Sequence, residues 1–174
     1  MVILGDSLGA GYEMTKGDGF VEVLGGRLGI EITNLSKSGI TTGDTRPRVK
    51  EEVLPLKPSL VLLQVGGNDA LQKVDPARTK ENLAAMIEEL QGAGIPVILL
   101  GVRGGLLNDD YKDVYKDLAS TYQTGFVPDL LDGILTHPEL KIDSIHPNAK
   151  GHQVVADHVE PELRRVLALI GGLQ

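Results

Sequence analysis

The chain has no cysteine and no tryptophan, and it has only two phenylalanines and four tyrosines among 174 residues. Without cysteine it can form no disulfide, no thiolate nucleophile and no cysteine-ligated metal centre. The shortage of aromatic rings argues against a site that binds its ligand by stacking. No apolar run approaches the roughly 20 residues of a membrane-spanning helix. We therefore expect a globular protein without an integral membrane segment.

Basic residues are also too few and too scattered to form a patch. The 17 Lys and Arg are outnumbered by 24 Asp and Glu, and the formal charge is −7. Such a field repels phosphate backbones, so we expect no nucleic-acid partner. The length predicts one domain spanning residues 1–174. The chain begins directly on a predicted strand without a leader, which fits a cytoplasmic protein or a mature periplasmic or secreted one. A monomer is compatible with this composition, and the oligomeric state is left unknown.

Short apolar runs alternate with longer amphipathic stretches along the whole chain. Alternation of this kind predicts a mostly parallel sheet covered by helices on both faces. The pattern predicts strands at 2–4, 30–35, 60–65, 95–100 and 125–127. It predicts helices at 19–28, 42–56 (interrupted early by Pro47), 76–91, 110–122 and 149–170, the last with a kink at Glu160-Pro161.

We expect the five strands in the order 2-1-3-4-5. In such a sheet the functional site lies at the carboxyl ends of the strands, beside the point where the strand order reverses. Three polar, glycine-containing segments follow predicted strands there: Gly5-Asp6-Ser7, Ser38-Gly39 and Gly66-Gly67-Asn68-Asp69. The loop from Asp143 to Pro147 must reach the same edge if these segments work together.

Three residues could form a nucleophile, a base and its orienting acid. A serine hydroxyl needs a base to take its proton, and the base needs a group that holds it in place. Ser7 is the candidate nucleophile, His146 the base, and Asp143 the acid that orients His146. The alternatives are that Ser7 only caps a short helix, and that His146 is a surface residue paired locally with Asp143.

The segments between them supply hydrogen-bond donors for an oxyanion. The backbone amides of Ser7 and Gly39 and the side-chain amide of Asn68 are the candidates, since an oxyanion needs two or three fixed donors. The alternative for the Gly66–Asp69 segment is a plain turn, because Gly, Asn and Asp are turn formers.

Taken together, these motifs resemble the four sequence blocks of the SGNH/GDSL hydrolase superfamily. The blocks are Gly5-Asp6-Ser7-Leu8, Gly39, Gly66-Gly67-Asn68-Asp69 and Asp143-Ser144-Ile145-His146-Pro147. The segments 3–8, 10–12 and 63–69 are similar to the bacterial branch of multifunctional thioesterase I, lysophospholipase L1 and arylesterase.

The resemblance implies a flavodoxin-like three-layer α/β/α sandwich and a catalytic triad of Ser7, Asp143 and His146. It implies an oxyanion hole from Ser7, Gly39 and Asn68, and no metal or other cofactor. The expected function is a serine esterase or thioesterase, lipase- or lysophospholipase-like, which hydrolyses a small-molecule acyl ester through an acyl-enzyme. The alternatives are a carbohydrate acetylesterase of the same fold and a non-catalytic flavodoxin-like binding protein that holds a flavin.

Leucines after the third and fourth strands could line an acyl groove, or could simply pack their loops. They are Leu71, Leu106 and Leu107. The segment 103–107 departs from the Pro/Asn-containing loop that is more usual in the branch. The remaining histidines, His137, His152 and His158, are expected at the surface or at the edge of the core.

Overall fold

Five short strands form one parallel sheet in the order β2-β1-β3-β4-β5, as the sequence predicts. The structure is a computed structural model and describes residues 1–102 and 111–171. The strands are β1 (Val2–Gly5), β2 (Thr33–Asn34), β3 (Val61–Gln64), β4 (Val97–Leu100) and β5 (Gly125–Val127). Each neighbouring pair is parallel, with Val2 opposite both Thr33 and Val61.

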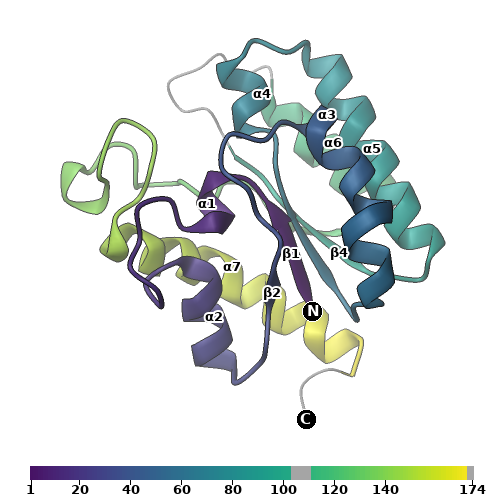
Figure 1. Ribbon diagram of the computed structural model, residues 1–174, viewed down its shortest axis with the longest axis horizontal. Coiled ribbons are helices and arrows are strands. Elements are labelled where there is room, and N and C mark those ends of the chain that lie inside the picture. The colour runs from purple at the N-terminus through teal and green to yellow at the C-terminus, as the bar shows by residue number, and fades with distance from the viewer. Residues whose placement is uncertain (103–110, 172–174) are drawn as a thin grey trace.

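Helices cover both faces of the sheet, which gives the expected three layers (Figure 1). Alternate residues of each strand point to opposite faces. Ile3, Leu62 and Ile98 join one core with helices α2 (Phe20–Leu28) and α7 (Ala149–Leu169). Their neighbours Leu4 and Leu63 join a second core with η1 (Val49–Val53), which follows α3 (Thr42–Arg48), and with α5 (Pro76–Gly92) and α6 (Lys112–Tyr122).

Local signals in the sequence set the ends of the longer helices. Asp75 caps α5 by accepting from the Ala77 amide, and Pro76 fills the first helical position. Asn148 caps α7 by accepting from the Gly151 amide. Pro161 lies within α7 without ending it.

Two elements differ from the prediction. The second strand is only Thr33–Asn34, because it forms the edge of the sheet, both residues are exposed, and it pairs only with β1. The helix predicted over 42–56 contains Pro47 but changes geometry after Arg48. It continues as a wider turn, η1 (Val49–Val53), and a tighter one, η2 (Leu54–Leu56). In η1 the Leu54 amide donates to the Val49 carbonyl five residues back, and the next residue, Pro55, has no amide hydrogen with which a regular helix could continue.

The carboxyl ends of the strands carry the shortest helices. α1 (Ser7–Ala10) follows β1 and α4 (Gly67–Leu71) follows β3, at the edge opposite the N-terminus (Figure 1). The loop region 128–147 contains one short 3₁₀ helix, η4 (Pro138–Leu140), and extends beside α1. Within the described ranges, no helix has the length and hydropathy that crossing a membrane would require.

Candidate active site

A buried hydrogen-bond network fixes the turn after β1. Asp6 caps α1 by accepting from the Leu8 amide at 3.0 Å, and it also accepts from Gln64 Nε2 at 2.9 Å. Gln64 Oε1 accepts from the Gly9 amide at 3.0 Å. Burial raises the pKa of Asp6 to about 6, although the hydrogen bonds from Gln64 and Leu8 lower it. Asp6 therefore braces the turn, and Ser7 is not the helix cap.

Ser7, His146 and Asp143 lie in one chain of hydrogen bonds. Ser7 Oγ is 3.1 Å from His146 Nε2, although 139 positions separate the two residues. His146 Nδ1 is 2.7 Å from Asp143 Oδ2. The other carboxylate oxygen, Oδ1, accepts from the amides of Ile145 and His146 at 2.8 Å each. The carboxylate is thus held on two sides, and the imidazole bridges it to the hydroxyl.

The electrostatics of Asp143 set the proton arrangement on the ring. Burial raises the pKa of Asp143, but hydrogen bonds from the His146 ring and from two backbone amides outweigh it and hold the pKa at about 2. The carboxylate is therefore ionised at neutral pH and can only accept. Nδ1 of His146 must donate to it, so Nε2 carries the lone pair that faces Ser7 Oγ in the neutral ring.

Short-range backbone contacts shape the loop that presents His146. Lys141 and Pro147 form an isolated antiparallel bridge, and the Ile142 amide donates to the His146 carbonyl at 3.0 Å. Asn148 Nδ2 donates to the Glu139 carbonyl at 2.9 Å while its oxygen caps α7. The loop is therefore anchored to the start of the longest helix.

The segments that carry Gly39 and Asn68 are tied to each other. Asn68 Nδ2 donates to the Ile40 carbonyl at 2.9 Å, which brings the loop after β2 against the turn after β3. Gly39 and Gly66 have φ values of +78° and +126°, which side chains rarely tolerate. One amide hydrogen of Asn68 is donated to Ile40, and among residues 1–102 and 111–171 the other has no acceptor, so it can serve a further one.

Buried polar groups that the sequence reasoning did not assign to the site hold these loops. Asp69 accepts from the Thr42 amide at 2.8 Å and from the hydroxyls of Thr42 and Thr79. Asn82 Nδ2 donates to Thr42 Oγ1. Gln64, which holds the turn after β1, is another such residue. Its signal in the sequence is a polar side chain inside the otherwise apolar strand 60–65, where burial demands a partner.

The remaining residues that the sequence singled out are three leucines and three histidines. Leu71 ends α4 with 47% of its surface exposed, while Leu106 and Leu107 fall outside the described residues, as does the segment 103–107. His137 is exposed and His158 half-buried, as expected.

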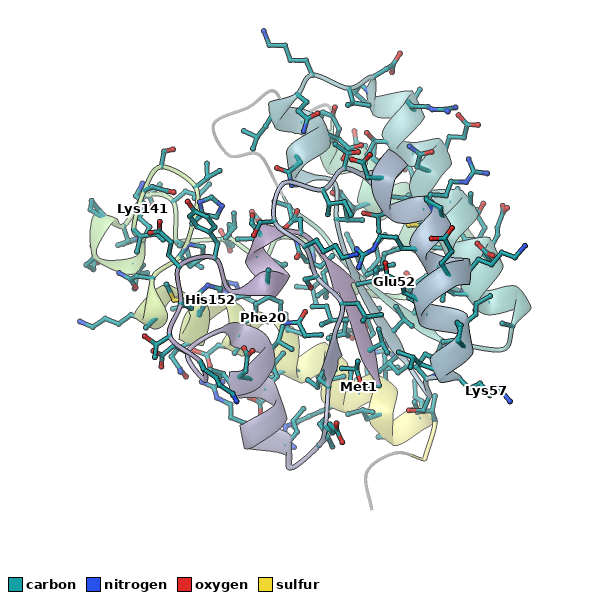
Figure 2. The ribbon with its side chains drawn as sticks, in the orientation of Figure 1. Met1, Phe20, Glu52, Lys57, Lys141 and His152 are labelled. Carbon is teal, nitrogen blue, oxygen red and sulfur yellow. The ribbon has the colours of Figure 1, made fainter. Side chains whose placement is uncertain are left out.

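His152 is buried rather than at the surface. Its Nδ1 accepts from the Phe20 amide and its ring stacks on Phe20 (Figure 2). No three His, Asp or Glu side chains converge as a metal-ligand group within residues 1–102 and 111–171.

Comparisons with known proteins show which family the chain belongs to. The model of the GDSL-like lipase/acylhydrolase family matches residues 3–154. The arylesterase of Vibrio mimicus is 31% identical, with 94% of this chain and 87% of the relative covered. Esterase TesA of Pseudomonas aeruginosa is 30% identical, covering 96% and 89%.

A solved structure supports the same assignment. The crystal structure of TesA superposes with a TM-score of 0.90 at 29% identity, covering 95% of this chain and 98% of that one. The resemblance based on the sequence motifs, the predicted hydrolase class and the α/β fold are therefore confirmed. The chain belongs to the GDSL-like lipase/acylhydrolase family of ester hydrolases.

Proposed function

We propose that this protein is a serine esterase and thioesterase that cleaves small-molecule acyl substrates through an acyl-enzyme, with residues 1–174 forming one SGNH hydrolase domain. The observation that carries the proposal is the 3.1 Å contact between Ser7 Oγ and His146 Nε2, with Asp143 on the far side of the ring. Membership of a hydrolase family favours this reading over the flavin-binding alternative.

In the first half-reaction, His146 Nε2 takes the proton of Ser7 as Oγ attacks the acyl carbonyl carbon. The ionised Asp143 stabilises the imidazolium that forms and keeps the ring in position. The imidazolium then gives its proton to the leaving alcohol or thiol, and the acyl group stays on Ser7. In the second half-reaction His146 takes a proton from water, the resulting hydroxide attacks the acyl carbon, and Ser7 is released with its proton restored.

The negative oxygen of each tetrahedral intermediate would be held by the amides of Ser7 and Gly39 and by the free amide hydrogen of Asn68. The tie between Asn68 and Ile40 supports this role, because it fixes the Asn68 side chain before substrate arrives. Preorganised donors stabilise developing charge without reorganising during the reaction. Removing one such donor typically costs about 100- to 1,000-fold in rate.

Exposed apolar side chains favour an acyl chain over an acetylated sugar. Tyr12, Leu71 and Ile142 keep 38%, 47% and 41% of their surface exposed, and Tyr12 contacts His146 while Ile142 lies in the His146 loop. A carbohydrate acetylesterase needs polar contacts to sugar hydroxyls instead. Rates on acetyl, butyryl and octanoyl p-nitrophenyl esters would separate the two, since the lipid-type reading requires the octanoyl ester to be hydrolysed at least as efficiently as the acetyl ester.

The test of the reaction itself is Ser7→Ala. This variant should lose hydrolysis of p-nitrophenyl butyrate to the background level, with an unchanged far-UV circular dichroism spectrum. Ser38→Ala is the matched control, because it removes a hydroxyl from the loop near Gly39 without touching the nucleophile. Full activity in Ser7→Ala would remove Ser7 from the mechanism.

A further inference from the structure

The aromatic ring of Tyr12 lies against the imidazole of His146. The ring centroids are 4.4 Å apart and the planes are inclined by 31°. Tyr12 is 38% exposed, so its position is not explained by burial in a core. The contact is with the same ring whose Nε2 faces Ser7 Oγ.

The turn that carries Ser7 also places Tyr12. The Tyr12 amide donates to the Ser7 carbonyl at 3.1 Å, and Gly11 between them adopts the left-handed conformation with φ of +65°. The chain reverses direction at Gly11 and directs the next residue back over the site. A residue with a Cβ would be strained in this conformation. One turn thus holds the Ser7 hydroxyl beside Nε2 of the imidazole and the Tyr12 ring against the same imidazole.

We propose that Tyr12 is a positioning residue for His146, whose ring keeps the imidazole from rotating away from Ser7 and stabilises the imidazolium through its π face. This inference rests on the proposed function. A cation within about 6 Å of a tyrosine ring is attracted by the ring quadrupole. His146 becomes such a cation when it takes the Ser7 proton and loses the charge when the leaving group departs, so the contact is strongest when the reaction needs it.

Other titratable groups also act on His146 and are left unchanged by substitution at Tyr12. Asp143 contacts Nδ1 at 2.7 Å, and Asp6 and His152 act on His146 at longer range from the turn after β1 and from α7. Glu13, beside Tyr12, and Asp143 raise the pKa of the Tyr12 hydroxyl, so this group is neutral at neutral pH. The hydroxyl thus brings no charge to His146, and the ring contact assigns the role to the ring of Tyr12.

The experiment compares Tyr12→Phe and Tyr12→Leu with wild type on p-nitrophenyl butyrate from pH 5 to 9. Tyr12→Phe keeps the ring and should stay within about twofold of the wild-type kcat. Tyr12→Leu should lose about three- to tenfold in kcat with little change in KM. The acid limb of its kcat/KM profile should move to lower pH by about half a unit, because the protonated ring is no longer favoured.

Tyr122→Leu is the matched control, since this tyrosine ends α6 at the opposite edge of the sheet. It should leave kcat and the profile unchanged. If Tyr12→Leu raises KM alone, with kcat and the acid limb unmoved, Tyr12 is only a substrate contact and the proposal is wrong. Ser7→Ala is measured alongside. Full activity of Ser7→Ala overturns the proposed function itself. If Ser7→Ala is inactive but Tyr12→Leu has wild-type kinetics, only the role of Tyr12 is overturned.

Discussion

The structure allows the cost of substituting Gly66, a residue beside the candidate oxyanion hole, to be worked out from its surroundings. Gly66 lies between β3 and α4 with φ of +126°, directly before the segment that presents Asn68. A Cβ at this position would overlap the hydroxyl of Tyr115 and lie 3.3 Å from its Cζ. Tyr115 is buried, and its hydroxyl donates to the Val65 carbonyl at 3.0 Å. Gly66→Ala therefore meets two separate obstacles, the backbone conformation and the tyrosine oxygen.

The two obstacles have different magnitudes and can be separated. A side chain at an unfavourable positive φ costs about 1–3 kcal/mol, and overpacking a well-filled interior costs about 1–3 kcal/mol more. Gly66→Ala should therefore lower the free energy of unfolding by about 2–6 kcal/mol. Tyr115→Phe alone should cost about 1–3 kcal/mol, because it leaves the buried Val65 carbonyl without its partner.

The double variant Gly66→Ala/Tyr115→Phe removes the oxygen that the new methyl group would overlap. Its loss of stability should be smaller than the sum of the two single losses by about 1–3 kcal/mol, the overpacking part. Urea unfolding of wild type, both single variants and the double variant measures this coupling. Gly94→Ala is the control for backbone strain alone, because Gly94 has φ of +75° but no atom within 4 Å of the added Cβ. Strictly additive losses would refute the reasoning.

Two further predictions concern acid stability and the oxyanion hole. Burial lowers the pKa of His152 from 6.5 to about 4, helped by the charge of His146. The unfolded chain therefore binds this proton more readily. The contribution of His152 to stability should be full above pH 6.5 and fall by about 1.36 kcal/mol per pH unit toward pH 4, or about 3 kcal/mol in all, while the raised pKa of Asp6 gives a contribution of the opposite sign that both histidine variants keep. Urea unfolding between pH 7 and 4.5 should show His152→Asn losing this slope and the exposed-residue control His137→Asn keeping it; an equal slope in both would contradict the assignment. Asn68→Ala should lower kcat on p-nitrophenyl butyrate by about 100- to 1,000-fold with KM nearly unchanged, and a change confined to KM would make Asn68 a substrate-binding residue instead.

The three inner strands of the sheet, β1, β3 and β4, were predictable because their burial shows in the sequence. The apolar segments around Leu62 and Ile98 are covered on both faces, and a strand in that environment needs apolar residues at every position. The exposed edge strand at Thr33 was predicted too long, since an edge strand meets fewer constraints on where pairing ends. The change of helix geometry after Arg48 is a five-residue hydrogen-bond spacing from Leu54 back to Val49, and the apolar periodicity of the sequence does not distinguish that spacing from a regular helix.

The candidate site also has one part that could be predicted from the sequence and one part that could not. Ser7, Asp143 and His146 could be singled out because a hydroxyl, an imidazole and a carboxylate carry recognisable chemistry at recognisable positions. The contacts of Gln64 with Asp6 and of Tyr12 with His146 could not, because each joins elements whose meeting depends on the assembled fold. Sequence thus indicated the proposed reacting groups, while the groups that hold them required the structure.

Covalent labelling of the nucleophile tests the central claim most directly. A fluorophosphonate reacts with a serine hydroxyl only when a neighbouring base has activated it, and the adduct mimics the tetrahedral intermediate. Intact-mass and peptide mapping of the labelled protein should find one adduct, on Ser7, and His146→Ala should abolish it while the fold is kept. The account would be contradicted by an adduct on another residue. It would also be contradicted if the treated protein took up no label and yet hydrolysed esters.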